Sequence, residues 1–195
     1  MSEWTFMIDP AWQPADEDDE PPFEAVVGGW FLRDDGEVSL FRPNPGYQPS
    51  RPGLPTDPAD AALQRLAAAA SEDVTDGATE DATEGAAEDA TDGANDTDRG
   101  EALLSALAEV LLGVAVDEQG IALVVPAPDG VPSVLVTTAP PHRARVDTPA
   151  WREVTVTELA VALPPQDVDV LLNPGAPAST RLTADAVRSV ARPAR

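Results

Sequence analysis

Hydrophobic residues beyond position 100 follow a helical spacing first and a strand-like spacing afterwards. Between Leu103 and Leu111 the leucines and valines recur at intervals of one, three and four positions, which predicts an amphipathic helix that stops before Gly113. Short apolar runs bounded by Gly and Pro predict strands, at 114–117, 121–125, 133–137, 151–156 and 168–172. Helical patterns return at 157–163 and 183–191. This order predicts an α+β domain at 101–195, with a small mixed sheet and helices on one face.

The first 70 residues form a second module that is rich in aromatic side chains. Residues 23–27 and 30–33 have the composition of short strands, and 37–42 alternates as a returning strand. Asp34-Asp35-Gly36 between them supplies turn residues. The pattern predicts an aromatic-rich β-hairpin in the N-terminal module.

A proline-rich loop and a helix are predicted to complete this module, which spans residues 1–70. The prolines in 42–49 lack the amide hydrogen that a central strand needs, so this stretch is expected to be irregular. Asp57 is a typical N-cap residue, and Pro58 suits the first helical position. We therefore expect a helix from Pro58 to about Ala70.

Residues 71–100 form an acidic low-complexity segment between the two parts. They are almost entirely Ala, Thr, Gly, Asp and Glu, and Val74 is the only larger aliphatic residue. Ordering each residue costs about 1–2 kcal/mol of backbone entropy. Methyl groups that bury at about 25 cal/mol per Å² do not offset that cost. We therefore predict a disordered acidic insertion at 71–100.

The net charge of −23 arises mainly from this segment and from the acidic run at 16–20. Outside these stretches the charge is ordinary for a globular protein. All twelve basic residues are arginines, and they form no cluster or stripe along the sequence. The sequence therefore predicts no nucleic-acid partner.

Missing residue types exclude many kinds of chemistry. The chain has no cysteine, no lysine and a single histidine, so thiolate sites, a Walker A lysine, a Schiff-base lysine and a multi-histidine metal site are ruled out. An EF-hand loop counted from Asp96 would place Leu107 where a bidentate acid is needed. His142 follows two prolines and is expected in an exposed loop, with a catalytic base as the minor alternative. We predict a non-enzymatic protein without cofactors or metals.

The N-terminus and the hydropathy pattern indicate where the protein acts. Met1 is not followed by a basic and then an apolar segment, and no stretch reaches the roughly 18 apolar residues of a membrane span. The absence of cysteine gives no sign of an oxidising compartment. We expect a cytoplasmic protein that is not inserted into a membrane.

Two groups of residues are candidates for protein binding. Trp30, Tyr47 and Trp151 are either core aromatics or, if exposed together, a binding patch. Asn173-Pro174-Gly175 follows an apolar strand and is either a strand-ending turn or a recognition loop. We name all six as candidate protein-binding residues and leave both alternatives open.

Two stretches resemble known families. The N-terminal module resembles actinobacterial proteins associated with type VII secretion systems, on the residues Val26-Val27-Gly28-Gly29-Trp30, Asn44-Pro45-Gly46-Tyr47 and Thr56-Asp57-Pro58-Ala59-Asp60-Ala61. The C-terminal half is similar to the N-terminal domain of the SseB (enhanced serine sensitivity) family, on Val136-Thr137-Thr138 and Leu171-Leu172-Asn173-Pro174-Gly175. The SseB resemblance implies a motif that ends a strand and implies no catalytic residues.

The resemblances imply an accessory or regulatory protein-binding component of a type VII (ESX) secretion system. The alternative is an SseB-like regulatory or toxin-immunity module unrelated to secretion. A hydrolase that uses His142 is the weakest hypothesis. An exported substrate is not expected, because Tyr47, the single tyrosine, is followed by Arg51 at the position where the export signal has an acid. The sequence leaves the partner and the oligomeric state open.

Overall fold

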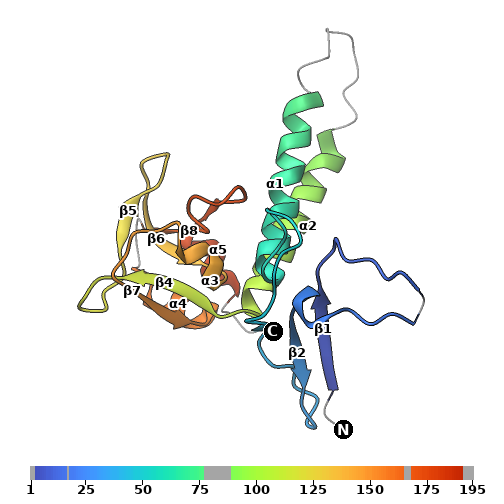
Figure 1. The fold of residues 1–195 in the computed structure, drawn as a ribbon. Helices are drawn as coiled ribbons and strands as arrows, with labels where there is room; N and C mark the ends of the chain where they lie inside the picture. The colour runs from blue at the N-terminus through green and yellow to red at the C-terminus, as the bar shows by residue number, and fades with distance from the viewer. Residues whose placement is uncertain (1–2, 17, 77–88, 165–167, 191–195) are drawn as a thin grey trace, which may run out of the picture.

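Two β-sheets lie on either side of a pair of long helices (Figure 1). The computed structural model describes residues 3–16, 18–76, 89–164 and 168–190, and within 72–76 and 89–97 it describes the backbone alone. The five helices and two sheets among these residues confirm the predicted α+β class.

The long helices, α1 (Pro58–Asp76) and α2 (Asp89–Ala108), lie side by side and pack against each other (Figure 1). Asp57 caps α1 as predicted, since its Oδ1 accepts a hydrogen bond from the Asp60 amide at 2.8 Å. Both helices continue into the segment predicted to be disordered, because its alanines favour helix and each helix packs against the other. The middle of that prediction, residues 77–88, lies outside the described residues.

The small sheet has the order β1-β2-β3, and β2 and β3 form the predicted antiparallel hairpin. Its strands are β1 (Glu3–Ile8), β2 (Val26–Leu32) and β3 (Arg42–Pro43), and a 3-10 turn, η1 (Phe23–Ala25), precedes β2. The predicted turn at Gly36 is present, and the chain returns beside β2 through the Leu32–Val38 bridge and β3. Strand β1, which was not predicted, pairs with β2 along most of its length. The predicted break between 23–27 and 30–33 is absent, because β2 continues through Gly28 and Gly29. Both glycines lie inside β2, where the Phe41 ring approaches Gly28 too closely for any side chain there.

The larger sheet has the order β7-β4-β6-β8-β9, and β5 pairs with β6. Its strands are β4 (Leu112–Val116), β5 (Val124–Pro126), β6 (Pro132–Thr137), β7 (Ala150–Val154), β8 (Asp169–Leu172) and β9 (Thr180–Leu182). Strands β6 and β8 are parallel, and the other pairs are antiparallel, which confirms the predicted mixed sheet. Strand β9 was not predicted.

Helices cover the apolar side chains of this sheet. α4 (Val156–Ala162) and α5 (Ala184–Val190) pack against each other. Leu159 of α4 faces Val114 and Val116 on one face of β4. A capping box between Thr155 and Glu158 fixes the start of α4. The opposite face of β4, at Gly113, meets Arg143 of α3 (Pro140–Arg143), a short helix that the sequence did not reveal.

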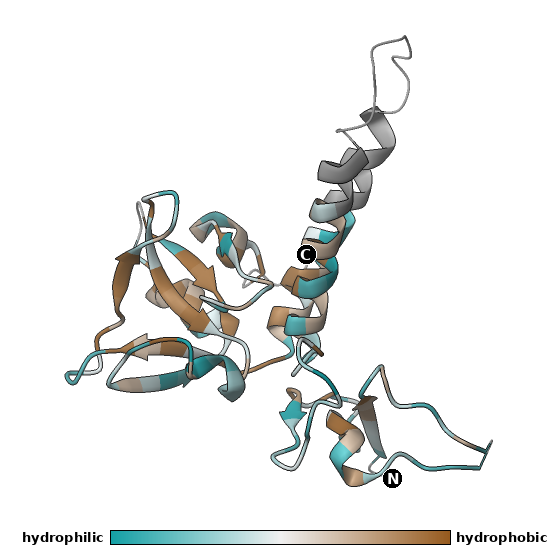
Figure 2. Ribbon diagram, turned by 45° about the horizontal axis from the view of Figure 1, so that its top comes forward, coloured by the Kyte–Doolittle hydropathy of each residue, from teal (hydrophilic) through white to brown (hydrophobic). Residues whose placement is uncertain are grey.

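One continuous core joins both sheets and the helix pair. It includes Val27 and Phe41 near the small sheet, Leu63 of α1, Leu107 of α2 and Val136 of β6. Brown hydrophobic segments in Figure 2 gather in the strands of the larger sheet and at the base of the helices. The N-terminal module and the C-terminal part therefore share a core, and the predicted boundaries at 70 and 101 fall inside α1 and α2.

Candidate functional site

The predicted aromatic candidates do not form one exposed patch. Trp30 is half-buried, and its ring meets Phe41 edge-on at 5.0 Å between centroids. Tyr47 is also half-buried, and burial together with the neighbouring Asp9 carboxylate raises its pKa to about 12. Trp151 lies on the other sheet beneath the Arg143 guanidinium, which is 5.7 Å from the ring centroid. Each of the three aromatic rings is held by its own local packing.

The Asn173-Pro174-Gly175 motif ends β8 in a tight turn. Asn173 is fully buried and has a φ of +48°, and its amide oxygen accepts a hydrogen bond from the Thr138 backbone N–H at 2.9 Å. Its Nδ2 donates to the Thr138 hydroxyl at 3.1 Å. Pro174 is half-buried and Gly175 is exposed. Asn173 therefore links β8 to the end of β6 and has no surface to offer a partner.

An exposed aromatic cluster lies on the outer face of the small sheet, where sequence analysis did not place a site. Trp4 and Phe6 point to the same face of β1 and are stacked with centroids 6.0 Å apart, and Phe31 of β2 meets Trp4 at 5.4 Å. Trp4 is 43% exposed and Phe6 is 56% exposed. The alternation of β1 is the signal that could have found this aromatic face, which we define as Trp4, Phe6 and Phe31.

The aromatic face adjoins an unpaired sheet edge. β1 ends the strand order of the small sheet, and no described strand pairs with its outer side. The opposite edge strand, β3, has two residues, and one of them is Pro43, which has no amide hydrogen to donate. Because an open edge can accept an additional strand, β1 is the edge of this sheet that suits pairing with another chain.

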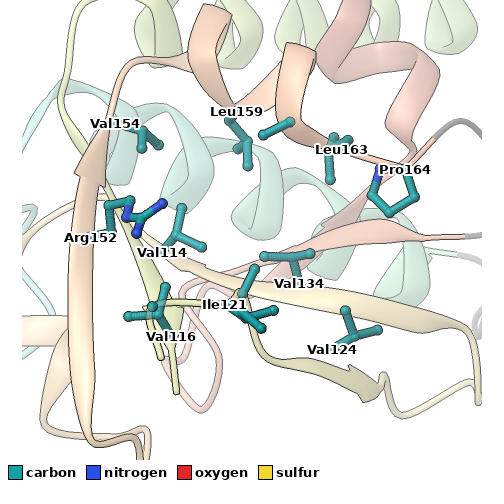
Figure 3. Close-up of a pocket in the computed structure, with 13 residues that line it drawn as sticks. Val114, Val116, Ile121, Val124, Val134, Arg152, Val154, Leu159, Leu163 and Pro164 are labelled. Carbon is teal, nitrogen blue, oxygen red and sulfur yellow. The ribbon is translucent and has the colours of Figure 1, made fainter. Parts of the chain in front are cut away.

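A second surface feature is an apolar groove between α4 and the larger sheet (Figure 3). Its cavity measures about 380 Å³. Val114, Val134 and Val154 form its floor, and Leu159 and Leu163 form one wall. Arg152 is the single charged residue in its lining. We return to this groove below.

A group of polar side chains around the buried His142 joins the N-terminal module to the C-terminal part of the chain. Nε2 of His142 lies 3.4 Å from Oδ2 of Asp60 and 3.2 Å from the Thr56 hydroxyl. The Thr56 amide also donates to Asp60 Oδ2, at 3.0 Å. Nδ1 of His142 lies 3.3 Å from a guanidinium nitrogen of Arg145. We call Thr56, Asp60, His142 and Arg145 the histidine network.

The prediction that His142 is exposed was wrong. His142 is 6% exposed, because Pro140 and Pro141 start α3 and the helical turn directs His142 toward α1. Arginine only donates hydrogen bonds, so Nδ1 is the acceptor and Nε2 carries the ring proton toward Asp60 and Thr56. Both ring nitrogens are therefore occupied. An imidazole held in this way has no nitrogen left to take a proton from a substrate.

Burial and hydrogen bonding act in opposite directions on the two aspartates of α1. Burial raises the pKa of Asp57, and its bonds with the Asp60 amide and the Thr138 hydroxyl only partly oppose this. Burial also acts to raise the pKa of Asp60, but the bond and the charge interaction with His142 outweigh it and leave that pKa lowered. Burial therefore disfavours the ionised form of Asp57, whereas the partners of Asp60 favour its ionised form.

We expect Asp57→Asn to unfold no more easily than the wild type at pH 7, and to be more stable by about 1 kcal/mol. Asparagine keeps the N-cap acceptor while removing a buried charge. A raised pKa in the folded state gives stability that is present below the unfolded value, 3.8, and is lost as pH rises through the folded pKa. The advantage of the variant should therefore shrink as the pH falls toward 4, in urea titrations at several pH values.

The matched control is Asp57→Ala, which removes both the charge and the cap. We expect it to destabilise the protein by about 1 kcal/mol at pH 7, because the Asp60 amide loses its acceptor. An asparagine variant that is as unstable as the alanine variant would mean that Asp57 is ionised and needed as an anion.

The described residues give no sign of a metal site or a membrane helix. No group of three or more His, Asp or Glu side chains among them is placed to hold a metal ion. Within the same ranges, none of the helices combines the length and the apolar composition needed to cross a bilayer.

Comparison with protein-family models, curated proteins and solved structures gave no match for this chain.

Proposed function

We propose that this protein is a non-enzymatic accessory or regulatory component of a type VII secretion system that acts in the cytoplasm by binding another protein. The observation that carries the binding role is the aromatic face beside the open edge of β1. Exposed clustered aromatics are typical of binding hot spots. The association with secretion is supported by the sequence resemblance of the N-terminal module.

Strand addition is the mode of binding that the small sheet favours. An extended segment of the partner would pair with β1, and its alternate side chains would cover Trp4 and Phe6. Main-chain hydrogen bonds would then contribute affinity, and the aromatic rings would select apolar side chains. The occupied ring of His142 supports the non-enzymatic part of the proposal.

A binding assay with purified type VII secretion components tests this proposal. We expect the secretion ATPase or a membrane component to bind the full chain, and the double variant Trp4→Ser/Phe6→Ser to bind at least about tenfold more weakly. Val161→Ser is the matched control, because Val161 is 82% exposed on α4 and lies outside the aromatic face.

Two results would contradict different parts of the proposal. If no secretion component binds, the association with secretion fails, and a partner from outside the system that needs Trp4 and Phe6 would favour the regulatory or immunity alternative. If a secretion component binds equally well to the double variant, the aromatic face is not the binding surface. Circular dichroism of each variant shows whether the fold is retained.

A further inference from the structure

The apolar groove is a preformed recess at the end of the layer between α4 and the larger sheet (Figure 3). Its floor and walls are aliphatic, and two residues at its rim, Ile121 and Val124, are 65% and 48% exposed. A volume of about 380 Å³ falls in the range of sites for small molecules. The residues at the rim expose apolar area that a ligand would cover.

One exposed cation, Arg152, borders this apolar lining. The guanidinium of Arg152 extends from β7 toward the valines of the groove (Figure 3). Among the described residues it makes no hydrogen bond or ion pair, whereas Arg143, Arg181 and Arg188 each pair with an acid. No acidic side chain lines the groove, although the chain carries a net charge of −23. The unpaired cation makes the groove suited to an anion.

The loop before β5 leaves room for this guanidinium. Gly120 has a φ of +79°, and a Cβ at this position would lie 2.8 Å from a terminal nitrogen of Arg152. Asp117 holds the loop by accepting hydrogen bonds from the Gln119 and Ile121 amides, at 2.9 and 2.8 Å. Gly120 and the turn held by Asp117 therefore lie directly beside the Arg152 guanidinium.

We propose that the groove binds an aliphatic monocarboxylate, with its alkyl chain against the valines and leucines and its carboxylate on Arg152. The lining decides against a peptide, because Arg152 is its one polar side chain. The amide groups of a bound peptide would be buried without partners, whereas an alkyl chain carries no such groups. A carboxylate satisfies the guanidinium through charge-assisted hydrogen bonds.

Titration calorimetry of the full chain with octanoate tests the proposal. We expect saturable binding at one site, and weaker binding of octan-1-ol and of octyltrimethylammonium. Arg152→Gln should weaken octanoate binding about tenfold, because one charge-assisted contact is lost, and should leave octan-1-ol binding nearly unchanged. Arg33→Gln is the matched control, since Arg33 pairs with Glu37 beyond β2, far from the groove in the fold.

A second variant tests the position of the alkyl chain. Ala162 is exposed and lines the groove, so Ala162→Phe should fill it and abolish binding of both octanoate and octan-1-ol while retaining the circular dichroism spectrum. The proposal is overturned if octanoate does not saturate a site, if Arg152→Gln binds it as well as the wild type, or if Ala162→Phe binds it unchanged. Tighter binding of a short aliphatic peptide with a free C-terminal carboxylate would also overturn it, in favour of a peptide terminus.

Discussion

Replacing His142 with alanine is expected to lower the free energy of unfolding by about 3 kcal/mol. Asp60 is 1% exposed, and in the variant its carboxylate would stay buried without the imidazole that faces it. Leaving a buried polar group without its partner costs about 1–3 kcal/mol and more for a charged group, and the hydrogen bonds from the Thr56 amide and Gln64 to Asp60 remain. Urea denaturation at pH 7, followed by tryptophan fluorescence and by circular dichroism, measures the change.

A double-mutant cycle separates the pair from the rest of the histidine network. Asp60→Asn alone should also destabilise the protein, but His142→Ala combined with Asp60→Asn should cost less than the sum of the two, because the double variant has no buried carboxylate left without its partner. Additive effects would mean that the two side chains do not interact. A loss of less than about 1 kcal/mol in His142→Ala would show that the network does not hold the two parts together.

The pH dependence of the free energy of unfolding gives a further check, because the lowered pKa of Asp60 fixes the direction of the change. A lowered folded-state pKa gives stability that is present above the unfolded value, 3.8, and is lost as the pH falls through the folded pKa. The wild type should therefore lose the contribution of Asp60 below about pH 4, whereas Asp60→Asn should not show this loss. Asp57 acts in the opposite direction, so the slope should be compared in the Asp57→Asn background.

Local pattern was enough to predict most elements of the larger sheet. The apolar runs that form β6 and β8 are bounded by Pro and Gly, and α4 begins at a Thr–Glu capping box. The positions of these elements can therefore be predicted from neighbouring residues alone. α3 and β9 were not predicted, because each has four residues or fewer and is too short for a helical or strand-like hydrophobic period to be recognised.

In the small sheet, β1 and the continuity of β2 were not predicted, for a different reason. Its central strand, β2, contains Gly28 and Gly29, which sequence rules associate with turns. Here the glycines admit Phe41 on one face and Phe6 on the other, and both contacts come from segments distant in the chain. A close approach of this kind is visible only once the partner strands are in place.

The histidine network shows the same limit at the level of a site. The sequence identifies Asp57 as an N-cap from its neighbours alone. It does not identify the partner of Thr56, because His142 lies 86 positions further along the chain and follows two prolines typical of a loop. Local composition predicted exposure for His142, and the packing of α3 against α1 placed it in the interior.

The second large effect is expected for Asn173→Ala, which should cost about 3 kcal/mol. The substitution removes the acceptor of the buried Thr138 amide, and an unpaired buried amide costs about 1–3 kcal/mol. It also places alanine at a φ of +48°, a conformation that asparagine tolerates better and that adds about 1 kcal/mol. Urea denaturation again measures the sum.

Asn173→Gly separates these two contributions, because glycine accepts the positive φ but supplies no hydrogen bond. We expect it to be about 2 kcal/mol less stable than the wild type and about 1 kcal/mol more stable than Asn173→Ala. A glycine variant as stable as the wild type would mean that the bonds to Thr138 contribute nothing. The same variants test whether Asn173 takes part in recognition. If partner binding falls only in proportion to their unfolded fraction, Asn173 supports the fold at the end of β8. Only Pro174 and Gly175 of this turn could then contact a partner.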